Sequence, residues 1–139
     1  TTNFTLRAIP MMKKKGWGRV ITITSIYGVI GGGRPWFNMA KAAQTTLMKN
    51  MSLNKEFVRN GITFNSIAPG GIMIPDTGWD EQMKSDPLGF KTMIDENFPL
   101  GRMGTPEEVG DLVTFLASPR AGLINGASIV IDGSETPKF

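Results

Sequence analysis

The side chains that could do chemistry in this sequence are few, because its 139 residues include neither His nor Cys. The lack of His removes the commonest general base and the commonest metal ligand, and the lack of Cys removes disulfides and thiolate chemistry. We therefore expect no metal site, and a catalyst here must use hydroxyls, Lys, carboxylates or a cofactor. Ser25 and Lys41 are the two residues whose positions favour such chemistry.

Ser25 closes a β-branched segment, residues 19–25, that predicts a buried strand. Lys41 lies in the first turn of a helix expected at residues 38–60. Ligands of open α/β sheets bind beyond the carboxyl ends of the strands. A hydroxyl and an ammonium that converge on one crevice could polarise a carbonyl and hold a ribose. Taken singly, Ser25 is equally consistent with a turn residue at the strand end, and Lys41 fits a solvated helix residue better.

Segments of strand character alternate with segments of helical character along the chain. Strands are expected at residues 19–25, 62–68 and 127–132, and helices at residues 1–15, 38–60 and 105–118. The last helix has a capping-box start, with Thr105 as the cap, Pro106 at its first position and Glu108 at its third. The alternation predicts an α/β fold with a parallel sheet. Three strands make a small sheet, so we interpret the chain as part of a doubly wound, Rossmann-like sheet in one domain.

The composition narrows the classes of function. The sequence has 15 basic and 12 acidic residues, a formal net charge of +3 and a pI near 9.4. Its basic residues are spread out except at Lys13, Lys14 and Lys15, which argues against nucleic acid as a partner. No apolar run approaches the roughly 20 residues of a membrane span, and the first residues do not resemble a signal peptide. We therefore expect a soluble, cytoplasmic protein that does not bind membranes.

Five segments together resemble the short-chain dehydrogenase/reductase family, in the family's order and at its separations. They are residues 18–25, 37–43, 60–70, 99–108 and 124–133. The resemblance covers nearly the whole chain and corresponds to the carboxyl-terminal half of the family's domain. It implies an oxidoreductase that transfers a hydride between NAD or NADP and a carbonyl/alcohol pair.

The resemblance also implies roles for individual residues. Ser25 matches the serine that polarises the substrate carbonyl, and Lys41 matches the lysine that holds the nicotinamide ribose. Position 37, four residues before that lysine, is the family's catalytic tyrosine. The backbone at Pro69, Gly70 and Ile72 matches the segment that passes along the nicotinamide. The family's dimers and tetramers predict a homo-oligomer built through residues 1–15 and 38–60, where Met48, Met51 and Phe57 could serve either an interface or the core.

Position 37 departs from the family because it is Phe, which has no proton to give or take. General acid–base catalysis contributes about a hundred- to ten-thousandfold in rate, so we expect this chain to be severely slowed. Either an engineered Tyr→Phe change or a naturally inactive relative would explain Phe37. An inactive relative would act as a nucleotide-binding scaffold or a regulatory partner. Tyr27, the only tyrosine, is a weaker candidate for a substitute catalytic role, and Ile74 stands where the family often has a threonine that contacts the carboxamide.

The family's glycine-rich dinucleotide turn has no counterpart here, since Gly31, Gly32 and Gly33 follow the serine strand instead. We therefore expect the amino-terminal dinucleotide-binding half to be absent, because the chain is a fragment, a partial sequence or one piece of a split protein. Residues 72–103 correspond to the family's substrate loop, with Trp79 as a tentative substrate contact beside Ser25 and Tyr27. They suit a lid over a bound substrate or, equally, a helical pair that covers the sheet edge. A sugar derivative and a β-keto acyl compound would both fit as substrates.

Overall fold

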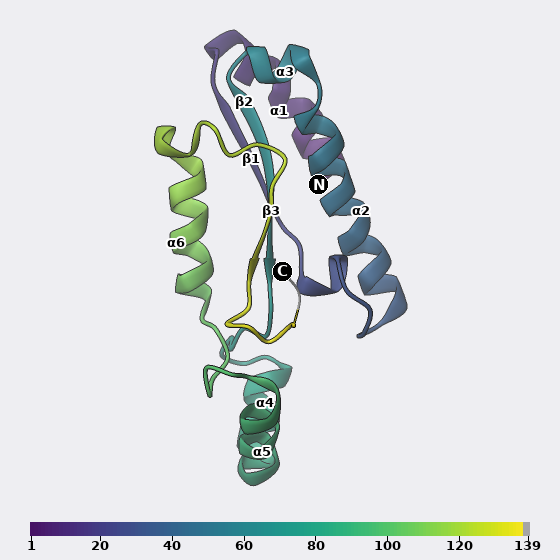
Figure 1. The fold of residues 1–139 in the computed structure, drawn as a ribbon, viewed down its shortest axis with the longest axis vertical. Coiled ribbons are helices and arrows are strands. Elements are labelled where there is room, and N and C mark those ends of the chain that lie inside the picture. The colour runs from purple at the N-terminus through teal and green to yellow at the C-terminus, as the bar shows by residue number, and fades with distance from the viewer. Residues whose placement is uncertain (138–139) are drawn as a thin grey trace.

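A parallel β-sheet lies at the centre of the molecule in the computed structural model, which describes residues 1–137 (Figure 1). Over these residues the sheet has three strands, β1 (Gly18–Ile23), β2 (Ile62–Pro69) and β3 (Ser128–Ile131), in the order β1-β2-β3. Gly18 pairs with Ile62, and Ser66 pairs with Ser128, both in parallel register. Every residue of β2 is buried because the strand is flanked on both sides. The α/β fold class and the parallel sheet are confirmed.

Helices cover both faces of this sheet. Helices α1 (Thr2–Lys15) and α2 (Pro35–Ser52) lie on one face, and α6 (Pro106–Ala117) lies on the other (Figure 1). The alternation of side chains along β2 explains the two cores. On the α1–α2 face, Ile62 and Phe64 join a cluster with Met48, whereas Ile67 packs against Leu116 of α6 on the opposite face.

The helix expected at residues 38–60 is in fact two helices. Helix α2 begins earlier, with Pro35 at its first position, where the missing N–H costs nothing. It ends at Ser52, and the short α3 (Lys55–Arg59) follows. The Asn54 side chain accepts a hydrogen bond from the N–H of Glu56 at 2.9 Å, so it caps a new helix where the periodicity alone predicted continuation.

The segment between β2 and α6 forms a helical pair beyond the carboxyl ends of the strands. Helices α4 (Gly78–Ser85) and α5 (Pro87–Asn97) project from that end of the sheet (Figure 1). This segment has a small core of its own, made of Phe90 and Ile94 of α5 with Phe98 and Met103 after it. A parallel bridge between Ile72 and Gly104 joins the two ends of the segment.

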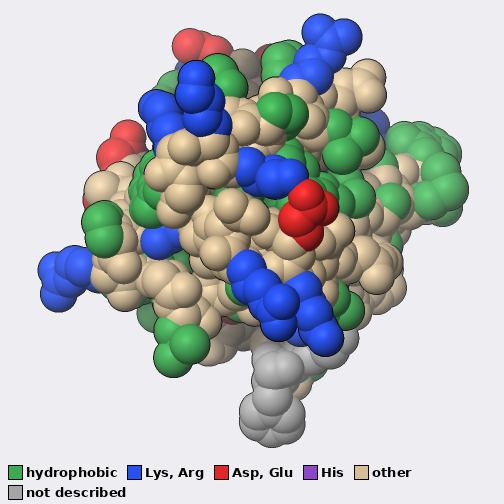
Figure 2. All heavy atoms as spheres, turned by 90° about the horizontal axis from the view of Figure 1, so that it is seen from above, with side chains coloured by type: hydrophobic (Ala, Val, Ile, Leu, Met, Phe, Trp, Pro, Cys, Tyr) green, Lys and Arg blue, Asp and Glu red, His purple; other side chains and the backbone are tan. Residues whose placement is uncertain are grey.

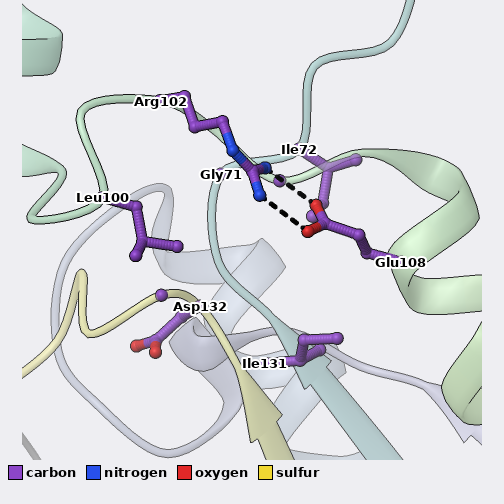
Figure 3. Close-up of a pocket in the computed structure, with 9 residues that line it drawn as sticks. Gly71, Ile72, Leu100, Arg102, Glu108, Ile131 and Asp132 are labelled. Atoms are coloured by element: carbon purple, nitrogen blue, oxygen red, sulfur yellow. Dashed lines mark hydrogen bonds and ion pairs between the residues drawn. The ribbon is translucent and has the colours of Figure 1, made fainter.

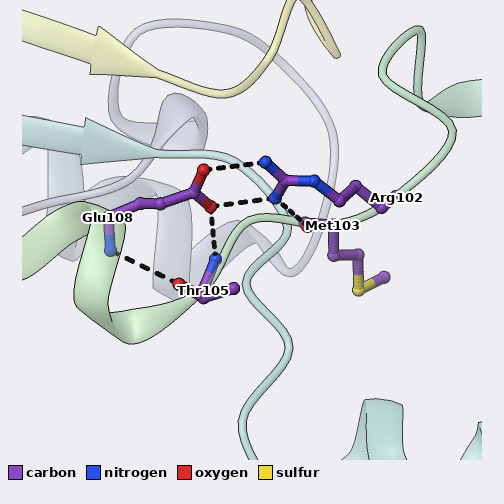
Figure 4. Close-up of polar contacts among 4 residues, drawn as sticks. All are labelled: Arg102, Met103, Thr105 and Glu108. Atoms are coloured by element: carbon purple, nitrogen blue, oxygen red, sulfur yellow. Dashed lines mark hydrogen bonds and ion pairs between the residues drawn. The ribbon is translucent and has the colours of Figure 1, made fainter.

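The start of α6 confirms the predicted capping box (Figure 4). The N–H of Glu108 donates to Thr105 Oγ1 at 3.4 Å, and the N–H of Thr105 donates to Glu108 Oε2 at 2.9 Å. Arg102 adds a two-pronged pair to the same carboxylate, at 2.8 and 2.9 Å. The Arg102 hydrogen bonds, followed by the Thr105 amide, lower the pKa of Glu108 to about 2.

The end of the molecule that carries the amino ends of the strands is rich in exposed Lys and Arg side chains (Figure 2). Lys13 forms an ion pair with Glu56 there, which links α1 to α3. Within the described residues, no helix is both long and apolar enough to cross a bilayer.

Met48 is 1% exposed, and Met51 and Phe57 pack against the same core cluster. These three side chains therefore belong to the core rather than to an open interface.

Candidate functional site

Ser25 lies just beyond the carboxyl end of β1, and its surroundings hold it there. The neighbouring Thr24 ties the strand end to β2, since its N–H and its hydroxyl both donate to the Ile67 carbonyl, at 2.7 and 2.9 Å. The chain then turns into the single-turn 3₁₀ helix η1 (Ile26–Gly28). Ser25 caps this turn, because its Oγ accepts a hydrogen bond from the N–H of Tyr27 at 3.2 Å. The hydroxyl is buried and fixed at the rim of the sheet.

Lys41 reaches the same rim from α2. Its Nζ donates to the Ile23 carbonyl at 3.2 Å, at the last residue of β1. Because α2 begins at Pro35, Lys41 lies in its second turn rather than its first. Phe37 is one turn earlier on the same helix, and Lys41 Nζ lies 5.5 Å from the centroid of its ring. An ammonium at this distance from an aromatic face is attracted to it.

The site is a crevice of about 200 Å³ between the sheet rim and α4. Its lining residues come from η1, α2, the segment after β2, α4 and the carboxyl-terminal segment: Ser25, Ile26, Tyr27, Phe37, Gly70, Gly71, Trp79 and Glu135. Three residues expected at the substrate, Ser25, Tyr27 and Trp79, therefore line one crevice. Phe37 forms part of the same wall, so the predicted catalytic serine and the tyrosine position share one space.

The predicted cofactor segment is divided between this crevice and its neighbour. Gly70 lines the crevice, Pro69 is the buried last residue of β2, and Ile72 lines an adjoining cavity of about 120 Å³ (Figure 3). In this second cavity the Arg102–Glu108 pair lies on one side and Asp132 on the other (Figure 3). Gly71 lines both spaces and so connects them.

Trp36 and Ile74 lie outside the crevice. Trp36 lines a separate hollow with Phe37, Tyr27, Gly33 and Arg34 on its walls, so it walls a neighbouring space. Ile74 is 45% exposed and is not among the residues that line the crevice.

Glu135 is the residue of this crevice that sequence reasoning missed. Its Oε2 accepts a hydrogen bond from the N–H of Gly71 at 2.6 Å. Burial raises the pKa of the Glu135 carboxyl, the Gly71 hydrogen bond opposes this rise, and the charge of Asp132 adds to it. The only sequence signal was the turn at Asp132–Ser134, which follows a strand and so had to lie at the same rim. No motif singles out the residue after that turn.

The arrangement combines a fixed hydroxyl, an ammonium, aromatic walls and one carboxyl at the carboxyl ends of parallel strands. A hydroxyl of this kind can donate to a carbonyl oxygen, and an ammonium can hold vicinal hydroxyls. The phenyl ring of Phe37 fills space without a proton. Such an arrangement can support polar binding and proton transfer, and the sequence offers neither a nucleophilic cysteine nor a histidine base.

Comparisons with known proteins identify relatives of this chain. Residues 1–134 match the family model described as enoyl-(acyl carrier protein) reductase. Nodulation protein G of Azospirillum brasilense is 36% identical over 132 residues, which are 94% of this chain and 50% of that protein. The chain thus spans about half the length of the curated relatives it matches.

Solved structures show the same likeness in three dimensions. An oxidoreductase of the short-chain dehydrogenase/reductase family from Burkholderia thailandensis matches with a TM-score of 0.81 and 26% identity, over 91% of this chain and 47% of that one. The structure of ElxO with NADP bound matches with a TM-score of 0.80 and 27% identity, over 92% of this chain and 50% of that one. With a family-model match over residues 1–134 and this fold, the chain belongs to the short-chain dehydrogenase/reductase family.

Proposed function

We propose that this chain supplies the substrate-facing half of an NAD(P)-dependent oxidoreductase that transfers a hydride between nicotinamide and a carbonyl/alcohol pair. The observation that carries the proposal is the meeting of Ser25, Phe37 and Lys41 at one rim of the sheet. Ser25 donates its hydroxyl proton in a hydrogen bond to the carbonyl oxygen, and Lys41 holds the ribose. ElxO, which shares the fold, has NADP bound in its structure, and this supports a nicotinamide cofactor.

The residues of the rim fit such a cofactor. Gly70 and Gly71 line the crevice without room for a side chain, because a Cβ would lie 2.3 Å from Glu135 Oε2 at Gly70 and 2.7 Å from the Phe98 ring at Gly71. With no Cβ at either residue, the crevice wall there is backbone alone, packed against Glu135 and Phe98. Of the proposed cofactor segment, Gly70 lies on this wall, with Pro69 and Ile72 on either side of the two glycines, and Lys41 is the nearby donor for ribose hydroxyls. The bound cofactor supplies the hydride, and the protein orients it and handles the proton.

The site is completed by segments with different roles. We propose that the pyrophosphate site belongs to a dinucleotide-binding half outside these 139 residues, in the same or a separate chain. Helices α4 and α5 act as the substrate loop, residues 72–103, with Trp79 against the substrate. The substrate is either a sugar derivative or a β-keto acyl compound. A dimer or tetramer forms through α1 and α2, whose exposed apolar side chains include Phe4, Met11 and Met39.

Restoring the phenol tests the function. The intact protein and its Phe37→Tyr variant are assayed for oxidation of NADH and NADPH, with acetoacetyl-coenzyme A and a panel of keto sugars as carbonyl probes. We expect the variant to be faster, by at most the hundred- to ten-thousandfold, roughly, that a positioned acid contributes. Phe37→Leu is the matched control, because it changes the ring without adding a proton.

Phe37 itself favours a second function, a catalytically silent relative that binds nucleotide as a scaffold or regulatory partner. The two functions differ in the outcome of the same assay. Carbonyl-dependent oxidation in Phe37→Tyr supports the oxidoreductase. Silence of both proteins across the panel, with NADPH binding retained in fluorescence titrations, would establish the scaffold instead.

A further inference from the structure

The proposed reaction requires a proton donor at the crevice, and position 37 does not supply one. Carbonyl reduction requires a proton at the carbonyl oxygen, and Phe37, which stands at the family's tyrosine position, has none. The ring nevertheless lines the crevice together with Ser25, so the reacting oxygen would lie within this space. A replacement donor must therefore line the same crevice.

Three lining residues carry an ionisable or exchangeable side-chain proton of suitable kind: Ser25, Tyr27 and Glu135. Ser25 Oγ already accepts from the N–H of Tyr27, and an alcohol is a weak proton source. The ring of Tyr27 lies against the glycine loop, where a Cβ added to Gly32 would come 2.9 Å from its Cε1. Lys41 is engaged with the Ile23 carbonyl and is not among the lining residues.

The turn after β3 directs the Glu135 side chain into the crevice. Asp132 organises this turn, since its carboxylate accepts from the N–H of Ser134 at 2.9 Å and from the N–H of Thr136 at 3.0 Å. The hydroxyl of Thr136 donates to the same carboxylate at 2.7 Å. Glu135 Oε2 is then anchored on the N–H of Gly71, while Oε1 has no hydrogen-bond partner within residues 1–137. One carboxyl oxygen is therefore held by the backbone at the wall of the crevice.

The electrostatics of the carboxyl fit a proton donor. Burial, followed by the charge of Asp132, raises the pKa of Glu135, although the Gly71 amide opposes the rise. Of the other nearby charges, Arg102 and Glu108 pair with each other at the adjoining cavity. Lys41, beside Phe37, donates to the Ile23 carbonyl. A raised pKa keeps the acid form present to higher pH than for an ordinary glutamate, as a general acid needs.

We propose that Glu135 is the proton donor and acceptor of this crevice, in the role that a phenol at position 37 would otherwise fill. This inference rests on the proposed oxidoreductase function. As the carbonyl carbon accepts the hydride of the reduced nicotinamide cofactor, the π-electron pair of the C=O bond moves to oxygen. The O–H bond of Glu135 breaks and a new O–H bond forms on the substrate. The products are an alcohol, the oxidised cofactor and the Glu135 carboxylate, which water reprotonates.

The test is a double-mutant cycle in the intact protein, with acetoacetyl-coenzyme A, or another ketone that Phe37→Tyr reduces, as the probe. Glu135→Gln keeps an acceptor oxygen for the Gly71 N–H but removes the proton. We expect it to lower kcat/KM at least tenfold in the natural Phe37 background and less than threefold beside Phe37→Tyr. Glu107→Gln, an exposed glutamate of α6 outside the crevice, is the matched control, with less than threefold loss in the Phe37 background, and Glu135→Asp should recover part of the rate. Tyr27→Phe tests the phenol as the alternative donor.

The pH profile provides a second activity readout. With Phe37, the rate of carbonyl reduction should fall as pH rises through the Glu135 pKa, because the acid form is lost. With Phe37→Tyr this fall should move to higher pH, toward the range of a phenol.

A third readout needs no turnover. Carbon-13 titration of the glutamate carboxyl signal that Glu135→Gln removes should give a pKa above that of the exposed glutamates. A signal that titrates with the exposed glutamates or below them would overturn the proposal.

The remaining outcomes also decide the question. Equal loss in both backgrounds would assign Glu135 a structural role, and loss in Tyr27→Phe with none in Glu135→Gln would assign the proton to Tyr27. Activity of Phe37→Tyr with no residual activity of the natural protein would overturn the role of Glu135 and leave the oxidoreductase standing. Silence of every variant would overturn both.

Discussion

The position of the Lys41 side chain on α2 is set by the end of strand β1. Its hydrogen bond to the Ile23 carbonyl fixes the ammonium at the end of β1, and its position one turn after Phe37 sets it against that ring. This contact is solvent-exposed, so it adds little to the stability of the fold. Its function would be to place a charge beside the crevice.

We therefore predict a separation of binding from stability in Lys41→Met. Methionine keeps much of the chain length but loses the charged donor, and hydrogen bonds to charged groups contribute about 1.5–3 kcal/mol. We expect NADPH binding in the intact protein to weaken about tenfold to a hundredfold, from that energy. Fluorescence titration measures the affinity, and thermal unfolding should show a nearly unchanged melting temperature. Unaltered affinity would contradict the ribose role, and Lys49→Met, farther along the same helix, is the control.

At the scale of elements, the start of α6 is determined by residues that are close to it in the sequence. Thr105, Pro106 and Glu108 define the helix start from sequence alone, because each acts on backbone groups within one turn. Arg102, six residues before Glu108, then binds its carboxylate in a bidentate pair. The cap and the ion pair thus act together at the junction between the α4–α5 segment and the sheet.

This junction predicts a stability change with pH. The folded pKa of Glu108, about 2, lies below the 4.5 of an unperturbed glutamate. A depressed folded pKa means that the stabilisation is complete above the unfolded value and is lost as pH falls through the folded one. Glu108→Gln should therefore melt below the natural protein at pH 7, with a gap that narrows between pH 4.5 and 2. Calorimetry across this range measures it, and Glu107→Gln, exposed in the same turn, should show no narrowing.

Elements whose signals are local were predictable, and features that depend on distant contacts were not. The strands and the α6 cap follow from β-branched runs and capping chemistry. The break before α3 was missed because apolar positions continue on both sides of it, at Met51 and at Phe57, and only the side chain of Asn54 reveals a new cap. Glu135 was missed for a related reason, since its partner Gly71 lies 64 residues away and no motif marks the pair.

At the scale of the whole molecule, β1 and β3 are the two edges of the three-stranded sheet within residues 1–137. Strand β1 pairs on one side only, with β2. The N–H groups of Gly18 and Thr24 donate toward β2, to Gly61 and Ile67, so the alternate N–H groups between them face the outer edge. Ile23 belongs to this outer set and is 42% exposed. An open edge with an apolar side chain is a template for pairing with another chain.

We predict that the 139-residue chain self-associates through this edge. Proline substitutions on the two sides of β1, the outer edge and the side that faces β2, should have different effects. Ile23→Pro removes an outward donor and leaves the ladder to β2 intact, so it should reduce association several-fold with little loss of helical signal. Thr24→Pro is the matched control on the next residue. It removes the 2.7 Å hydrogen bond to Ile67, and it should lower the melting temperature without reducing association. Light scattering with size-exclusion chromatography measures the mass against concentration. A concentration-independent monomer with cooperative unfolding would show that the edge of β1 needs no partner, and the argument for a larger sheet would then fail.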